Sequence, residues 1–93
     1  MLTERRQRLL QLLLNAKGPL PATEIGRLLG CPAHSVRYDL KVLAGWVTDY
    51  GCTLIATPGI GYELTGDREA IRSALDALTS AERIPYIYAL SPR

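Results

Sequence analysis

The sequence predicts a small, mostly α-helical domain with one β-hairpin and a further helix after the hairpin. Three observations point to this fold class. Leucine-rich stretches with helical spacing fill residues 2–46, a glycine and a proline interrupt them at residues 30–32, and a segment with the two-residue period of β-strands follows at residues 52–65. With 93 residues, the chain has room for a single small hydrophobic core.

The first helix is expected over residues 3–16. Thr3 is a suitable N-cap, and the segment 15–19 ends the helix because it combines a glycine with a proline that cannot continue the ladder. The apolar face consists of four leucines: Leu9, Leu10, Leu13 and Leu14. Three arginines project from the first two turns, where they are either solvated or within reach of nucleic-acid phosphates: Arg5, Arg6 and Arg8.

A second, short helix is expected from residue 22 or 23 to residue 29. Before it, Pro21 biases Leu20 towards an extended conformation that can pair as a short strand. Gly26 is expected to face the point where the next helix crosses closely, and Gly30 to supply the turn that follows. The side chains expected to face inward are Ile25, Leu28 and Leu29.

The third helix, expected from residue 32 or 33 to about residue 45 with a further turn that Gly51 closes, carries two different faces. One is an apolar line that predicts the core side: Val36, Leu40 and Leu43. The other points nearly the opposite way and offers donors, positive charge and an aromatic hydroxyl: His34, Arg37, Tyr38 and Lys41. Such a helix, held by a short helix and a tight turn, is typical of a DNA-reading helix-turn-helix.

Residues 52–65 are expected to form a β-hairpin. Leu54 and Leu64 alternate with their neighbours, and Pro58-Gly59-Ile60-Gly61 supplies the reversal. A hairpin directly after the reading helix is the wing of a winged helix-turn-helix. The two glycines do not indicate nucleotide binding, because no βα unit with a third glycine accompanies them.

A last amphipathic helix is expected after Asp67, which can cap it, with Ile71, Leu75 and Leu78 along one face. The pattern at residues 79–82 is a capping box that starts another helix, which Pro85 interrupts. The apolar ending, residues 84–93, is a dimer contact, the start of a downstream domain, or a segment packed back on this one. We therefore divide the chain into a DNA-binding domain over residues 1–66 and a C-terminal helix with an apolar extension over residues 67–93.

The charge distribution favours a nucleic-acid partner. Residues 1–41 hold seven basic and three acidic side chains, a net charge of +4, whereas residues 42–93 hold four basic and six acidic ones, a net charge of −2. The helix-turn-helix half is thus the basic half, although a solvated surface gives similar numbers.

Several function classes are disfavoured by what the sequence contains. His34 is the single histidine, and no carboxylate pair or nucleophile–base spacing indicates an enzyme, so we predict no catalytic residues. Cys31 and Cys52 lack the spacing of a zinc site, and we expect no metal and no cofactor. No apolar run spans a membrane and no signal peptide is visible, which favours the cytoplasm.

The segment LLQLLL…GPLPATEIGRLLGCPAHSVRYDLKVL, followed by TPGIGYELTGD, resembles a known domain. It is similar to the N-terminal winged helix-turn-helix of mannitol-operon-type bacterial transcription regulators, which carry phosphotransferase-system regulation domains. The resemblance covers residues 5–78 and runs through Gly30, residues 36–40 and the wing at residues 58–64. The DNA-binding domain of biotin-ligase repressors, which shares the G-x-G-Y-x-L wing, is the second choice.

The resemblance implies a regulator of carbohydrate-uptake genes whose signal, phosphorylation or a small ligand, acts on regulatory domains that are absent here. Two departures are visible. Such proteins usually have a serine or threonine cap and an early arginine in the reading helix, where this chain has Pro32, Ala33 and His34. Their wing tip often carries lysine or arginine, whereas residues 57–60 are uncharged here.

We expect double-stranded DNA as the partner, with the third helix in the major groove. His34 and Ser35 are expected to meet base edges, Arg37 guanine or phosphate, and Tyr38 and Lys41 phosphates. Asp39 is expected to point inward or to pair with an arginine. The remaining site residues are Thr23 and Ala33, and in the wing Thr57, Pro58, Gly59 and Ile60.

A homodimer is expected as well, because one module buries too little surface for tight specific binding. The alternative is a winged helix used for protein–protein contacts or dimerisation without DNA binding, with the apolar C-terminal end as its working face.

Overall fold

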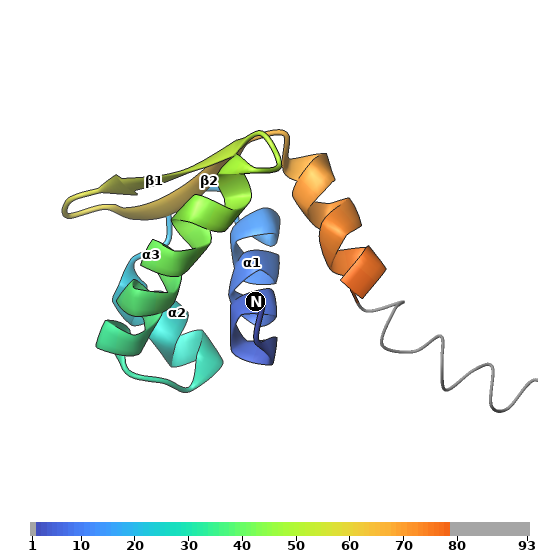
Figure 1. Ribbon diagram of the computed structural model, residues 1–93. Helices are drawn as coiled ribbons and strands as arrows, with labels where there is room; N and C mark the ends of the chain where they lie inside the picture. Colours follow the sequence, from blue (N-terminus) through green and yellow to red (C-terminus); the bar gives the residue numbers. More distant parts are fainter. Residues whose placement is uncertain (1, 79–93) are drawn as a thin grey trace, which may run out of the picture.

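The computed structural model describes residues 2–78, so the expected features at residues 79–93 lie outside the described residues. The chain forms α1 (Glu4–Asn15), α2 (Ala22–Leu29), α3 (Ala33–Thr48), β1 (Cys52–Thr57) and β2 (Gly61–Gly66), and residues 68–78 form a further helix. The hairpin projects beyond α3, and helix 68–78 lies on the other side of α1 from α2 and α3 (Figure 1). The predicted fold class, mostly helical with one antiparallel hairpin in the manner of a winged helix-turn-helix, is confirmed.

Helix α1 is capped and buried as its sequence predicts. The hydroxyl oxygen of Thr3 accepts a hydrogen bond of 3.2 Å from the backbone N–H of Arg6. One side of the helix is the centre of the core and consists of Leu9, Leu10, Leu13 and Leu14.

The turn between α2 and α3 depends on two glycines. Gly30 has a φ of 74°, and its N–H donates to the carbonyl of Gly26 at 2.7 Å. A Cβ on Gly26 would lie 2.5 Å from the carbonyl oxygen of Cys31, which confirms that the chain passes close to α2 at this glycine. The absence of a side chain at Gly26 therefore allows the start of α3 to lie close to α2.

One expectation about the helices is wrong, and a second is right only in part. Leu28 is 48% exposed instead of inward, because it lies about 200° around α2 from Gly26, the side that faces α3. Helix α3 runs to Thr48 without the end expected near Gly45, whereas the further helical turn that Gly51 closes is confirmed. It continues because Leu43 and Val47 are both fully buried and hold the helix against the core on either side of Gly45.

The hairpin is anchored to the segment before α2. Leu54 pairs with Leu64 and Ala56 with Tyr62. Leu20 adds an isolated bridge to Tyr62, with backbone hydrogen bonds of 2.9 and 2.8 Å, which confirms the expected short extended segment. This close approach requires Gly61, whose Cβ would lie 2.5 Å from the carbonyl carbon of Leu20.

Helix 68–78 begins with the expected cap and is fastened to α1. The Asp67 carboxylate accepts from the N–H of Ala70 at 3.3 Å, and Ile71 and Leu75 are buried. Arg68 donates from Nη2 to the carbonyl oxygens of Leu13, at 3.2 Å, and Leu14. These carbonyls belong to the last turn of α1, which has no basic residue of its own.

Replacing Arg68 by methionine is expected to lower the free energy of unfolding by about 1–2 kcal/mol, because partly buried helix-end carbonyls lose a charged donor. The matched control is Arg72→Met on the same helix, for which we expect a change within about 0.5 kcal/mol. Denaturant unfolding of both variants measures the difference. Equal midpoints for the two variants would contradict this role of Arg68.

Within residues 2–78, no helix is both long enough and apolar enough to cross a bilayer.

Candidate nucleic-acid interface

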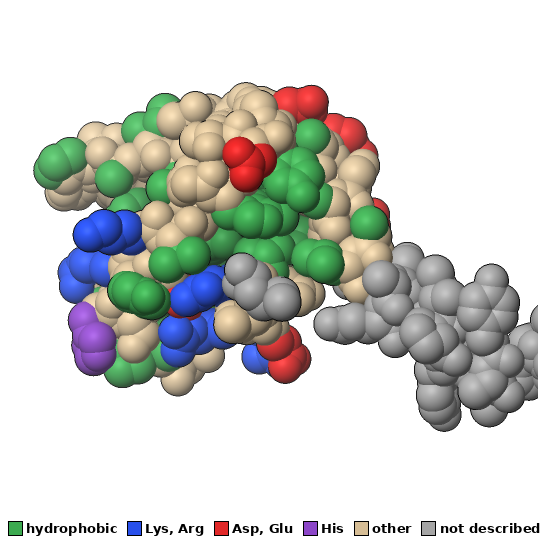
Figure 2. Space-filling view, in the orientation of Figure 1, with side chains coloured by type: hydrophobic (Ala, Val, Ile, Leu, Met, Phe, Trp, Pro, Cys, Tyr) green, Lys and Arg blue, Asp and Glu red, His purple; other side chains and the backbone are tan. Residues whose placement is uncertain are grey.

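Helix α3 presents the two faces that its spacing predicts. Val36, Leu40 and Leu43 are at most 2% exposed. On the opposite side, His34, Arg37, Tyr38 and Lys41 are all exposed, Tyr38 to 61%. Figure 2 shows lysine and arginine side chains and the histidine gathered beneath the wing, on the part of the surface that α2 and α3 form. One side of α3 therefore holds the core, while the other offers donors and positive charge to a partner.

A buried ion cluster joins α3 to α1 and confirms that Asp39 points inward. Within residues 2–78, Asp39 is the only charged residue that is buried, and its side chain is 1% exposed. Its Oδ2 accepts from Nε of Arg5 at 2.6 Å, and its Oδ1 accepts from Nε of Arg6 at 3.0 Å. Burial opposes ionisation, but the hydrogen bonds and charges of the two arginines together outweigh it and lower the pKa of the Asp39 carboxyl.

The same two arginines border the exposed face of α3. The guanidinium carbon of Arg6 lies 5.8 Å from the centre of the Tyr38 ring, within the range of a cation–π contact. Arg6 is 17% exposed and Arg5 is 43% exposed. The hydrogen bond to Asp39, followed by its charge, raises the pKa of Arg5. The sequence left these arginines either solvated or in contact with phosphate, and the expected pairing of Asp39 with an arginine is confirmed, although the sequence did not identify Arg5 and Arg6 as its partners.

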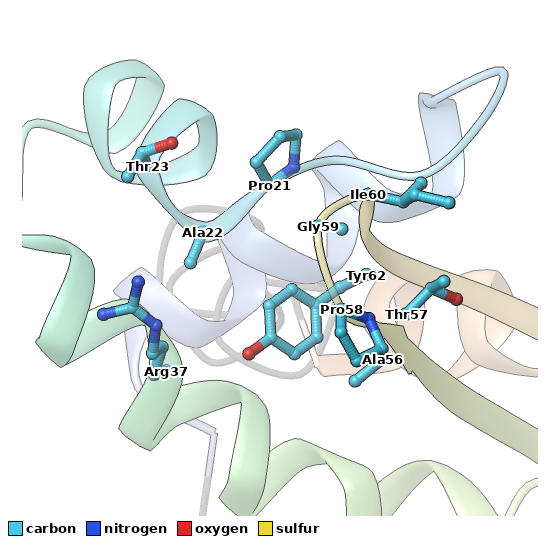
Figure 3. A pocket seen from close by; sticks show the side chains of 11 residues that line it. Pro21, Ala22, Thr23, Arg37, Ala56, Thr57, Pro58, Gly59, Ile60 and Tyr62 are labelled. Atoms are coloured by element: carbon cyan, nitrogen blue, oxygen red, sulfur yellow. The ribbon is translucent and has the colours of Figure 1, made fainter.

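A cleft of about 400 Å³ lies between α3, the start of α2 and the wing. Arg37 borders it from α3, Thr23 from α2, and residues 56–62 from the hairpin. In Figure 3 the ring of Tyr62 lies between Arg37 and the residues of the wing tip. The cleft thus brings together Thr23, Arg37 and the predicted wing residues Thr57, Pro58, Gly59 and Ile60.

The tip of the wing is apolar and exposed. The N–H of Ile60 donates to the carbonyl of Thr57 at 3.0 Å, which closes the turn, and Gly59 adopts a φ of 78° there. Ile60 is 56% exposed. Residues 57–61 carry no charged side chain, so the tip has no group for an ion pair with a phosphate.

The remaining predicted positions are less exposed. Ser35 is half-buried, and Ala33 is partly buried and packs against the core. Pro32 is the N-cap residue of α3 and makes no side-chain capping bond. The sequence analysis did not place Pro21, Ala22 and Tyr62 at the cleft. The expected extended conformation of Leu20 could have indicated them, because Leu20 pairs with Tyr62 of the hairpin.

The cysteines do not form a binding site in the structure. Cys52 is buried, and its thiol lies 3.0 Å from the carbonyl oxygen of Asp67, to which it donates. Burial and then the charge of Asp67 raise the pKa of the Cys52 thiol, which keeps it protonated. Among residues 2–78 no group of three or more histidine, cysteine, aspartate or glutamate side chains lies close enough to hold a metal ion.

Three helices packed around one core, a close crossing of α2 and α3, and a wing next to an exposed basic helix face define a domain of the winged helix-turn-helix class. The profile of the HTH domain family matches residues 5–63, which is more than half of the chain. The chain therefore belongs to the HTH domain family, and double-stranded DNA is the partner that membership implies. Comparisons with curated proteins and with solved structures found no match.

Proposed function

We propose that this chain binds double-stranded DNA sequence-specifically as the N-terminal module of a bacterial transcription regulator, with α3 in the major groove. The observation that carries the proposal is the exposed line of His34, Arg37, Tyr38 and Lys41, directly opposite the buried line of α3. A helix fixed on one side by the core can enter the groove without rearrangement.

The exposed side chains divide into two kinds of contact. His34 and Ser35 lie in the first turn of α3 and are assigned to base edges. Tyr38 and Lys41 are assigned to phosphates, and Arg37 to guanine or phosphate. Thr23, which lines the same cleft as Arg37, is assigned to the same strand of the backbone. The uncharged wing tip is assigned to apolar contact with the sugar edge of the DNA.

The wider role follows from the resemblance described above. We propose that the regulated genes serve carbohydrate uptake, as in mannitol-operon-type regulators with phosphotransferase-system domains. Residues 1–66 act as the DNA-binding domain, and residues 67–93 lead to a homodimer contact or to downstream regulatory domains. A dimer doubles the DNA surface that the protein contacts.

A second candidate function is protein–protein interaction or dimerisation without DNA binding. It is favoured by an apolar hollow of about 600 Å³ between Tyr50 and helix 68–78, which contributes Ala74 and Leu78 to the lining. The last described residue, Leu78, is among those that line this hollow.

Arg37→Ala is the test of the proposed function. Duplexes selected from a random-sequence pool by the wild-type protein are titrated with both proteins at several salt concentrations. The loss of one phosphate contact is expected to reduce the slope of log K against log salt by about 0.9. The loss of a guanine contact is expected instead to cost about 1–3 kcal/mol of discrimination at one base pair.

Arg72→Ala is the control because it removes the same charge from helix 68–78, and its salt slope is expected to equal that of the wild type. If selection enriches no sequence, and the affinity changes neither with salt concentration nor in Arg37→Ala, the proposal is wrong. Dimers in solution together with absent DNA affinity would support the second candidate.

A further inference from the structure

The two flanks of α3 are occupied by different parts of the molecule. Arg37 faces the flank on which the wing and the cleft lie. Asp39 lies two residues further along and points about 200° away from Arg37, towards α1. The wing therefore borders one flank of the reading helix, and the first turn of α1 borders the other.

DNA bound to α3 has backbone on both flanks. The major groove is about 12 Å wide and accepts one α-helix, so the phosphates of one strand run along each side of that helix. On the wing side, Arg37 and Thr23 are available to one strand. On the other side, α1 supplies two arginines: Arg5 and Arg6 both donate to Asp39, and Arg6 lies over the Tyr38 ring.

The guanidinium of Arg5 is placed to bind a phosphate of that second strand. It donates to Asp39 through Nε alone, and in the described part of the chain its two terminal nitrogens have no other hydrogen bond. Its side chain is 43% exposed, whereas that of Arg6 is 17% exposed and lies over the Tyr38 ring. The end-on pair of Nη donors matches two oxygens of a phosphate.

The carboxylate of Asp39 does not cancel this attraction. It is buried beneath the arginines and shared by both of them, so Arg5, Arg6 and Asp39 together carry one net positive charge. Because Asp39 fixes Nε of Arg5, the guanidinium loses little rotational freedom when it binds an anion.

We propose that Arg5 binds a backbone phosphate of the DNA strand that runs along the Asp39 side of α3, so that α1 is part of the DNA interface. This inference rests on the proposed function. It adds a contact that the pattern of the reading helix does not contain, because Arg5 lies 34 residues before Asp39 in the chain.

The test measures the salt dependence of binding to a mixed-sequence duplex, since phosphate contacts do not depend on base sequence. Arg5→Gln is expected to reduce the slope of log K against log salt by about 0.9, and affinity at about 0.1 M salt by about eightfold. Arg5→Lys, which keeps the charge, is expected to retain the slope. Arg72→Gln is the control for net charge and is expected to match the wild type.

The outcomes separate this inference from the proposed function. If the wild type and Arg72→Gln bind the duplex with a salt-dependent affinity and Arg5→Gln has the same slope, Arg5 does not contact phosphate, while the proposed function stands. If the wild type does not bind DNA, the proposed function itself fails. Unfolding midpoints identify a variant that has lost its fold, and Arg5→Lys then decides whether the charge at this position sets the slope.

Discussion

Gly26→Ala is expected to destabilise the protein by about 2 kcal/mol, although alanine is the better helix former by about 1 kcal/mol. The new Cβ would lie 2.5 Å from the carbonyl oxygen of Cys31 and 3.6 Å from the backbone nitrogen of Ala33. The first of these is a backbone atom that moves only if the turn moves, and overpacking of this kind costs about 1–3 kcal/mol or more. Relief of the clash displaces the start of α3 from α2.

Gly45→Ala is the matched control because Gly45 also lies in a helix. Gly45 is exposed, and a Cβ there meets nothing within 4 Å. We expect this variant to be more stable than the wild type by up to about 1 kcal/mol. Denaturant unfolding of both variants gives the two free energies. Stabilisation by both substitutions would show that α2 and the turn are not in close contact at Gly26.

Asp39→Ala is expected to lower the free energy of unfolding by about 2–3 kcal/mol. Removal of one partner from a buried ion pair costs about 3–5 kcal/mol when the other charge stays buried. The expected loss is smaller here because the Arg5 side chain is 43% exposed and can be solvated, while Arg6 at 17% exposed cannot be fully solvated. Denaturant unfolding at neutral pH measures the change, and a loss below about 0.5 kcal/mol would contradict the importance of the cluster.

The pH dependence of stability identifies the carboxylate as the cause. The folded protein holds the pKa of Asp39 below its ordinary value, which is about 3.9 in the unfolded chain. The contribution of Asp39 is therefore fully present above that ordinary value and is lost as the pH falls through the lower pKa of the folded state. Asp39→Asn removes this contribution, so the difference in stability between wild type and variant is expected to be constant near neutrality and to shrink in acid.

The helices were predictable where one periodic pattern decides the structure. The four buried leucines of α1 and the two faces of α3 follow from spacing alone, because a helix side that packs against a core must be apolar. Thr3 and Asp67 were identifiable as caps because capping requires only a short polar side chain next to the helix.

What the sequence did not reveal depends on contacts between distant residues. Leu28 has the inward spacing of α2, yet Gly26 decides which side of α2 faces α3. Arg5 and Arg6 were left as either solvated or phosphate-contacting residues, because nothing within α1 shows that a carboxylate of α3 lies beside them. Gly45 suggested the end of a helix that the burial of Leu43 and Val47 continues. The site residues on α3 and in the wing stay predictions until DNA binding is measured.

The pairing of Leu20 with Tyr62 has a consequence for the thermodynamics of binding. Two backbone hydrogen bonds and the close packing at Gly61 fix the start of β2, next to the wing tip, to the segment that leads into α2. The width of the cleft between Arg37 and the wing is thus set when the chain folds and not when a ligand enters. If DNA binds in this cleft as proposed, the strand loses its own freedom but orders little protein, so we expect the entropy penalty of association at this cleft to be small.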